Sequence, residues 1–280
     1  MLADEGKRGA MPEGPIFESA AVSAAFGSDA SYLGTGAFGE TWRVHNEAVK
    51  IMHKDSGARL QREIDGLQRV VQPNVVRLLR TGSVEIDGVD HVALHFDYVA
   101  GGDMKDAIEE GRLLPPNDTR AFLQGLLTGV AALHDEGIIH RDLKPANVAL
   151  RDGDWRSPVI LDLGLAKILD LSSLTAYPAL VGTAPYMAPE QLSGGRVRRL
   201  ADIFACGVLT YEAVAGVHPF YAPGTTVTVS ELAARIAVGP ERTPIANLSL
   251  EDQDLLLQMT SPAAHLRGTS RSLVEQLAER

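Results

Sequence analysis

Residues 138–150 read IIHRDLKPANVAL, in which polar side chains stand between apolar residues typical of buried β-structure. The polar residues are His140, Arg141, Asp142, Lys144 and Asn147. A chain normally keeps such groups in water, because an unpaired buried charge costs several kcal/mol. Their spacing therefore indicates a site that needs an acid, a cation and an amide at fixed positions.

The bulk composition sets the class of protein. Of the 280 residues, 45% are hydrophobic and 22% are charged, as in a large globular domain or two coupled lobes. The formal net charge of −10 argues against a nucleic-acid-binding protein, which would show a basic surface. We find no apolar run near the roughly 18 residues of a membrane span, and no signal-peptide pattern. The single cysteine, Cys206, fits a reducing compartment, so we expect a cytoplasmic location.

The first third of the chain predicts strands with one inserted helix. Residues 1–27 are rich in Ala, Gly, Glu and Pro and predict a flexible lead-in, within which ESAAVSAAFG could form a short helix. TWRVHNEAVKIM predicts a hairpin that turns near His45-Asn46-Glu47. SGARLQREIDGLQRVV has apolar residues spaced by 4, 3 and 4 positions, which predicts an amphipathic helix.

The rest of the chain predicts helices. DTRAFLQGLLTGVAALHDEG is a long helical stretch ended by Gly137, and RLADIFACGVLTYEAVAG is a second, strongly apolar one. Weaker helical stretches follow in VSELAARIAV, SLEDQDLLLQMT and SRSLVEQLAER. We therefore predict a β-rich lobe over 28–98 and a helical lobe over 99–280, joined by a Gly-Gly hinge near Gly101.

A glycine-rich loop and a lysine lie in the β-rich lobe. LGTGAFGETW places Gly34, Gly36 and Gly39 between two strands, which disfavours a dinucleotide-binding motif because that motif opens a helix. Glycines let backbone N–H groups approach phosphate oxygens without a Cβ in the way. Eleven residues after Gly39, Lys50 lies among apolar strand residues and needs an anionic partner. Glu63, thirteen residues further on, could fix its ammonium group.

These motifs, in this order, make the chain resemble a protein kinase from about Tyr32 to Arg267. GTGAFGET resembles the glycine-rich loop, AVKI the strand lysine, REIDGL the helix glutamate, FDYVAGGDM the hinge and HRDLKPAN the catalytic loop. DLG resembles the magnesium motif, APE the end of the activation segment, and DIFACGVLTYE the helix beneath the catalytic loop. The resemblance implies an α+β, bilobal protein kinase fold with a small β-rich N-lobe and a larger helical C-lobe.

The residues within these motifs resemble those of one class of protein kinases. The order of Asp142, Lys144 and Asn147, with Thr183 before APE, is similar to serine/threonine kinases of the Hanks type, and the Ala-rich chain looks bacterial. The resemblance implies transfer of the ATP γ-phosphate to protein Ser and Thr hydroxyls. It therefore implies protein substrates, and no nucleic-acid partner.

The resemblance assigns catalytic roles to four residues. Asp142 would accept or orient the proton of the substrate hydroxyl, and Lys144 would reach the transferred phosphoryl group. Lys50 would pair with the α- and β-phosphates, with Glu63 orienting it. It also implies supporting roles, in which Asp202 accepts bonds from the backbone of the catalytic loop, His140 supports that loop, and Glu190 pairs with Arg267.

The resemblance also implies two ligands, ATP and Mg²⁺, with Mn²⁺ as an alternative metal. Asn147 and Asp162 would hold the metal ion. The residues expected to contact ATP are Leu33, Gly34, Thr35, Gly36, Ala37, Phe38, Gly39, Thr41, Ala48, Lys50, Asp97, Val99, Asp103 and Ala149.

Several positions depart from the family pattern. Leu163 replaces the usual Phe of the magnesium motif and Gln72 replaces a His, while Phe96 at the gatekeeper position should narrow the pocket. Thr41 and Ala149 stand where larger apolar residues usually enclose the adenine ring. We therefore expect a less apolar adenine site with unchanged chemistry.

Two other classes stay open. A pseudokinase would bind ATP or a partner without transfer, but it would lack a catalytic residue, and Lys50, Asp142, Asn147 and Asp162 are all present. A small-molecule kinase of related fold is disfavoured by GTAPYMAPE, since in the family that segment docks a peptide.

The segment before APE suggests regulation by phosphorylation. Its hydroxyl residues are Ser172, Ser173, Thr175 and Tyr177. Thr175 matches the position commonly phosphorylated in bacterial kinases of this type. Arg141, Lys167 and Arg59 could converge on such a phosphate and order the segment. Autophosphorylation in trans would require self-association of the chain.

Overall fold

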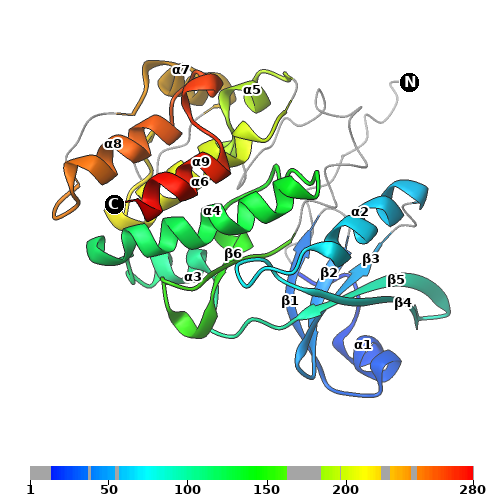
Figure 1. Cartoon of the computed structure of the whole chain (residues 1–280). Helices are drawn as coiled ribbons and strands as arrows, with labels where there is room; N and C mark the ends of the chain where they lie inside the picture. The colour runs from blue at the N-terminus through cyan, green and yellow to red at the C-terminus, as the bar shows by residue number, and fades with distance from the viewer. Residues whose placement is uncertain are drawn as a thin grey trace, which may run out of the picture. The chain divides into compact units, whose positions relative to one another are not determined.

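The computed structural model describes residues 14–36, 39–53, 57–162, 184–195, 197–221, 228–240 and 245–279. By its internal contacts the chain divides into two compact units. The smaller unit comprises Met1–Ala58 with Leu78–Tyr98, and the larger comprises Arg59–Arg77 with Val99–Arg280. The smaller unit is built on a sheet and the larger on helices, as predicted (Figure 1). Among the described residues, no helix is both long and apolar enough to cross a membrane.

The smaller unit contains a five-stranded antiparallel sheet in the order β1-β2-β3-β5-β4. Its strands are β1 (Ala30–Gly36), β2 (Gly39–Val44), β3 (Glu47–Met52), β4 (Leu78–Ile86) and β5 (Val89–Asp97). The predicted hairpin is confirmed, because Val44 pairs with Glu47 and His45 adopts a φ of 55° in the turn between them. Strand β1 is an edge strand, so the β1–β2 hairpin has only β3 as a neighbour within the sheet.

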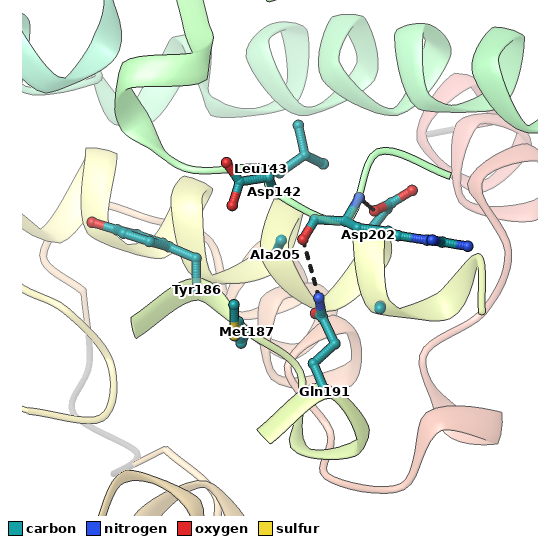
Figure 2. Close-up of a pocket in the computed structure, with 9 residues that line it drawn as sticks. Asp142, Leu143, Tyr186, Met187, Gln191, Asp202 and Ala205 are labelled. Carbon is teal, nitrogen blue, oxygen red and sulfur yellow. Dashed lines mark hydrogen bonds between the residues drawn. The ribbon is translucent and has the colours of Figure 1, made fainter. Parts of the chain in front are cut away.

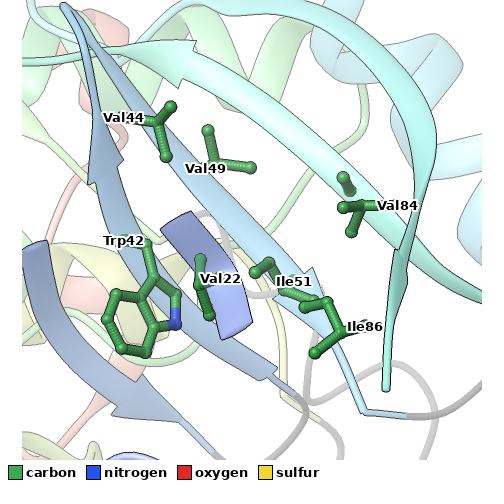
Figure 3. Packing of buried hydrophobic residues seen from close by; sticks show 8 residues of the cluster. Val22, Trp42, Val44, Val49, Ile51, Val84 and Ile86 are labelled. Carbon is green, nitrogen blue, oxygen red and sulfur yellow. The ribbon is translucent and has the colours of Figure 1, made fainter. Parts of the chain in front are cut away.

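The two faces of this sheet carry different residues. In the register of β2 and β3, Trp42 lies opposite Val49, whereas Thr41 lies opposite Lys50. Side chains alternate between faces along a strand, so Lys50 and Trp42 point to opposite sides of the sheet. The Trp42 face forms a buried core (Figure 3). Its members are Val22, Trp42, Val44, Val49, Ile51, Val84, Ile86 and Ala93.

Helix α1 (Ser19–Phe26) covers that core. Its Val22 is fully buried, and Gly27 ends the helix with a φ of 61°, a conformation that favours glycine. This differs from the expectation of a flexible lead-in over 1–27, because residues 14–27 are folded and α1 packs on the sheet. The short helix in ESAAVSAAFG is present, and residues 1–13 lie outside the described part.

The larger unit carries the remaining described α-helices, except for the first two residues of α2. They are α2 (Gly57–Arg69), α3 (Met104–Glu109), α4 (Thr119–Asp135), α5 (Pro189–Leu192), α6 (Leu200–Ala215), α7 (Val229–Val238), α8 (Leu250–Met259) and α9 (Ser270–Ala278). Every helix predicted from the sequence is present. Gly137 follows α4 with a φ of 77° and Gly216 caps α6 with a φ of 70°, so both predicted helix ends use the left-handed conformation. Almost every residue of α6 is buried, so this helix is the centre of the unit.

The boundary between the units differs in one respect from the predicted lobes. Most of α2 groups with the larger unit, where Gly66 lies beside Ile138 and Arg69 pairs with Glu136 at 2.6 Å. The Gly-Gly sequence lies just after Val99, where the second segment of the larger unit begins, and both glycines have positive φ. A Cβ on Gly101 would lie 2.1 Å from the carbonyl oxygen of Leu150, so only glycine fits there.

Candidate catalytic site

A buried carboxylate on α6 holds the backbone of the predicted catalytic loop. Asp202 is 2% exposed, and its Oδ2 accepts from the backbone N–H of His140 at 2.9 Å and from Nε2 of His134 at 2.8 Å. Its Oδ1 accepts from the backbone N–H of Arg141 at 2.8 Å. Both oxygens are thus satisfied, as a buried charge requires. The expected role of Asp202 is confirmed.

The hydrogen bond from Arg141 to Asp202 holds an unusual backbone conformation. Arg141 has a φ of 64°, in the left-handed region that residues with a Cβ rarely adopt. The N–H of this residue points at Asp202, and its carbonyl oxygen accepts from Nε2 of Gln191 at 3.1 Å (Figure 2). Since Arg141 directly precedes Asp142, these two bonds orient the backbone that carries the predicted catalytic acid.

The acid, the cation and the amide of the opening stretch converge. Nδ2 of Asn147 donates to the backbone carbonyl of Asp142 at 2.8 Å and to its Oδ2 at 3.3 Å. Nζ of Lys144 lies 3.2 Å from the same Oδ2. Asn147 is buried, whereas the side chains of Asp142 and Lys144 are 18% and 27% exposed. The partly exposed acid and cation are therefore held by a buried amide, an arrangement that suits chemistry on a molecule arriving from solvent.

The two expected metal ligands lie at one end of a small hairpin. Strands β6 (Val148–Leu150) and β7 (Pro158–Ile160) pair antiparallel, with Asn147 just before β6 and Asp162 just after β7. The N–H of Leu161 donates to the carbonyl of Asn147 at 2.9 Å, and Nε2 of His140 lies 2.9 Å from the Leu161 carbonyl. A carboxylate and an amide oxygen are ligands that Mg²⁺ and Mn²⁺ accept, so the residues present fit such an ion. His140 is fully buried and has the expected supporting role.

Two further contacts hold the described segment 184–195 in place. The hydroxyl of Tyr186 donates to Glu212 at 2.7 Å, and burial raises the pKa of both groups. Arg267 is fully buried and its guanidinium binds both carboxylate oxygens of Glu190, at 2.8 and 3.0 Å. The predicted Glu190–Arg267 pair is confirmed. A guanidinium with two parallel bonds to one carboxylate fixes direction as well as distance.

In the smaller unit, Lys50 is 5% exposed on β3, between Thr41 of β2 and Leu94 of β5. The expected ATP contacts described in this unit lie on its strands, and they are Leu33, Gly34, Thr35, Gly36, Gly39, Thr41, Ala48, Lys50 and Asp97. Gly39 has a packing reason beyond phosphate access, since a Cβ there would lie 2.4 Å from the carbonyl oxygen of Ile51.

Other expected contacts lie in the larger unit or outside the described part. Asp103 and Ala149 form a β-bridge, and Asp103 also caps α3 by accepting from the N–H of Asp106 at 2.9 Å. Burial raises the pKa of the Asp103 carboxyl. Val99 begins the second segment of the larger unit. Ala37 and Phe38 lie outside the described residues, and so does the side chain of Glu63 on α2, so its pairing with Lys50 stays a prediction.

Comparison with known proteins identifies the family. Residues 28–277 match the model of the protein kinase domain. This chain belongs to the protein kinase family. Serine/threonine-protein kinase pkn2 of Myxococcus xanthus is 35% identical over 207 residues, which cover 68% of this chain and 24% of that protein. Serine/threonine-protein kinase PkaB of Streptomyces coelicolor is 30% identical over 260 residues, which cover 86% of this chain and 60% of that protein.

A solved structure agrees with the fold. The crystal structure of Rad53 1-466 in complex with AMP-PNP matches this kinase with a TM-score of 0.70 at 26% identity. The match covers 88% of this chain and 64% of that one. The predicted kinase fold and the bacterial serine/threonine class are thus confirmed for this domain. The chain spans less than two thirds of the length of each of these three relatives.

Some predictions about this kinase fall on residues that the structure does not describe. Leu163, Lys167, Thr175 and Thr183 lie within 163–183, outside the described ranges. The replacement in the magnesium motif and the phosphorylation of Thr175 therefore stay predictions.

Sequence reasoning missed three residues that shape the described site. His134 on α4 binds Asp202, Gln191 holds the carbonyl of Arg141, and Glu40 on β2 is fully buried. Only Glu40 carried a signal, because it alternates with Trp42 and Val44 on the buried face of its strand.

Proposed function

We propose that this domain is an active serine/threonine protein kinase, which transfers the γ-phosphoryl group of ATP to Ser and Thr hydroxyls of proteins with Mg²⁺. The observation that carries this proposal is the convergence of the Asp142 carboxylate, the Lys144 ammonium and the Asn147 amide on a backbone anchored by Asp202. The AMP-PNP complex of the Rad53 structure supports an adenine nucleotide as the donor. Since ATP is that donor, we place the domain in the cytoplasm.

Each residue has a role that follows from its position. Asp142 accepts the proton of the substrate hydroxyl on its carboxylate and directs the oxygen toward the phosphorus. Lys144, 3.2 Å from that carboxylate, reaches the oxygens on which negative charge develops. Asn147 keeps Asp142 in place through its amide nitrogen, while its oxygen and the carboxylate of Asp162 would hold the metal ion. When bound, the metal ion neutralises charge on the phosphates.

The smaller unit supplies the nucleotide-binding residues. The backbone N–H groups of the β1–β2 hairpin approach the phosphates, and Lys50 binds the α- and β-phosphate oxygens. Glu63 orients Lys50. Lys50 is almost fully buried on its strand, so its ammonium group is shielded from water and its attraction to bound phosphate oxygens is strong.

Incubation with labelled ATP, Mg²⁺ or Mn²⁺, and a generic protein substrate tests the function. We expect label on protein Ser and Thr, which phosphoamino-acid analysis identifies, and no label with Asp142→Asn. A pseudokinase would bind nucleotide without transferring label, and a small-molecule kinase would leave every protein unlabelled. Mainly phosphotyrosine would contradict the proposed residue preference.

We propose further that the kinase autophosphorylates on Thr175, in trans between two copies. A phosphate carries a charge of about −1.5 to −2 and could pair with Arg141, Lys167 and Arg59, ordering the segment around it. Phosphopeptide mapping of the purified protein tests this proposal. We expect phosphate on Thr175 and lower activity in Thr175→Ala, and full activity without phosphate on the segment would contradict it.

A further inference from the structure

The β1–β2 hairpin contains a buried carboxylate that the proposed chemistry does not use. Glu40 directly follows Gly39 and is fully buried. In the strand register it lies opposite Thr35 of β1 and Ile51 of β3. Its side chain lies on the face of Trp42, opposite the face of Lys50. A charge in that position must have partners, because burial of an unpaired carboxylate is strongly unfavourable.

Two of the four hydrogen-bond partners of Glu40 come from the segment before the matched kinase domain, and Nε2 of His53 lies 3.9 Å from Oε1. Oε1 accepts from the backbone N–H of Ile16, and Oε2 accepts from the N–H of Phe17 at 3.3 Å. Nε1 of Trp42 donates to Oε2 at 3.2 Å, and the hydroxyl of Thr35 lies 3.5 Å from Oε1. Hydrogen bonds to an ionised acceptor are about twice as strong as neutral ones. Both oxygens of Glu40 therefore anchor the hairpin to residues 16 and 17.

Residues 16–26, which we call the N-terminal strap, are themselves fixed to the sheet. The ring of Phe17 packs against the rings of His53 and His91, with distances between ring centroids of 5.7 and 5.0 Å. Val22 is part of the buried core (Figure 3), and Oγ of Ser23 accepts from the N–H of Ala30 at 3.0 Å. The contacts with His53, after β3, and His91, on β5, anchor the strap outside the hairpin, whereas Ala30 belongs to β1; the strap can therefore hold Glu40 in place.

We infer that Glu40 is a positioning residue that ties the glycine-rich hairpin to the N-terminal strap. Strand β1 is at the edge of the sheet, so the hairpin is braced by β3 alone unless the strap adds a second support. A hairpin held in advance loses less conformational freedom when its N–H groups bind phosphates, and this raises affinity. The inference rests on the proposed role of the hairpin in binding ATP.

Two matched pairs of variants in the 280-residue chain test this inference. Glu40→Gln replaces one acceptor oxygen with an NH₂ group, which faces N–H donors in either orientation. Ile16→Pro removes one of those donors, while Ile16→Ala keeps it, and the Ile16 side chain is 54% exposed so that its loss matters little. Glu47→Gln is the control for Glu40→Gln, because Glu47 binds Arg80 and His95 on the same sheet and lies beside Val44, at the end of β2 that is farther from Gly39 and the glycine-rich turn.

Because the strap supports nucleotide binding rather than the chemical step, loss of its bonds should change the KM for ATP much more than kcat. We expect Glu40→Gln and Ile16→Pro to raise the KM for ATP about fivefold, with kcat within about twofold of the wild type. Hydrogen exchange should become faster at Thr35 and Thr41 in the nucleotide-free protein. Ile16→Ala and Glu47→Gln should leave both constants and the exchange rates unchanged.

The outcomes separate this inference from the proposed function. An unchanged KM in both Glu40→Gln and Ile16→Pro would overturn the role of the strap, and so would an equal rise in Glu47→Gln. If the wild-type protein bound no ATP in a direct titration, the proposed function would fail. Hydrogen exchange would then decide about the strap, since it needs no nucleotide, and unchanged exchange in both variants would overturn it.

Discussion

Replacing Asp202 with Asn should separate the stability of the domain from the geometry of its catalytic loop. The carboxylate accepts three hydrogen bonds, from the backbones of His140 and Arg141 and from His134. An Asn has one acceptor oxygen, and if that oxygen keeps the position of Oδ2, its NH₂ group faces the N–H of Arg141. A buried unsatisfied donor costs about 1–3 kcal/mol, and the other two bonds lose their charge. We expect the free energy of unfolding to fall by about 2–4 kcal/mol.

The loss of activity should exceed what this destabilisation explains. The left-handed backbone of Arg141, with its φ of 64°, costs about 1–2 kcal/mol relative to a relaxed conformation. Without the bond to Asp202 that backbone can relax and turn the neighbouring Asp142 away from its position. We expect kcat to fall by about 10- to 100-fold, since misplacing a reacting group by about 1 Å has an effect of that size.

Urea denaturation and steady-state kinetics, at a temperature where the variant is fully folded, measure the two effects. Thr210→Val is the control, because Thr210 is fully buried on the same helix and, among the described residues, its hydroxyl bonds only to the Cys206 carbonyl at 2.8 Å. It should lose some stability and keep its kcat. An unchanged kcat in Asp202→Asn would mean that Gln191 alone suffices to hold the carbonyl of Arg141, and would refute this reasoning.

Three more predictions concern the larger unit. Asp142→Asn should nearly abolish transfer in a kinase assay and keep the Kd for ATP within a few-fold, and retained turnover would exclude the proposed role. Arg267→Met should lower the free energy of unfolding in urea by about 3–5 kcal/mol, because Glu190 is left without its partner; a smaller change in Arg267→Lys would support this cause, and an equal one would not. His218 is neutral with Nδ1 accepting from the N–H of Phe220, and burial lowers its pKa to about 3. The unfolded chain takes up a proton at His218 near pH 6.5, so the free energy of unfolding falls as the pH drops from 6.5 toward 3, by up to about 1.4 kcal/mol per pH unit. Urea titrations at pH 7.5 and pH 5 should therefore show a smaller difference in the free energy of unfolding for His218→Asn than for the wild type.

The parts of this structure that follow local rules could be predicted from the sequence. The ends of α4 and α6 were predictable because a helix stops readily where glycine can take a positive φ, as Gly137 and Gly216 do. The position of Lys50 on a buried strand followed from its apolar neighbours in AVKI. The convergence of Asp142, Lys144 and Asn147 was predictable only through the family resemblance, since spacing alone does not say which groups meet.

Helix α1 shows why the rest could not be predicted. A single residue of this helix, Val22, is buried, so the sequence shows no helical period of apolar residues. Its stability comes from the sheet, whose outer face would otherwise expose Trp42 and Val49 to water. That face exists only after the strands have paired, and composition alone therefore made the segment look like a lead-in.

The partners of the two buried carboxylates, Asp202 and Glu40, cannot be read from the pattern of residues for a different reason. The role of Asp202 came from the family resemblance alone, and Glu40 was missed. Each is a charged residue whose main partners are backbone N–H groups, and every residue except proline has one, so no pattern of side chains marks the donor. Both acceptors serve a loop that must keep a conformation before its ligand arrives: the left-handed Arg141 in one case and an edge hairpin in the other. Side chains that pack a core act without direction, whereas a carboxylate fixes the direction of the N–H groups that it binds. A loop that positions reacting groups needs this direction, and that is why a buried acid is retained at each place despite the cost of removing its charge from water.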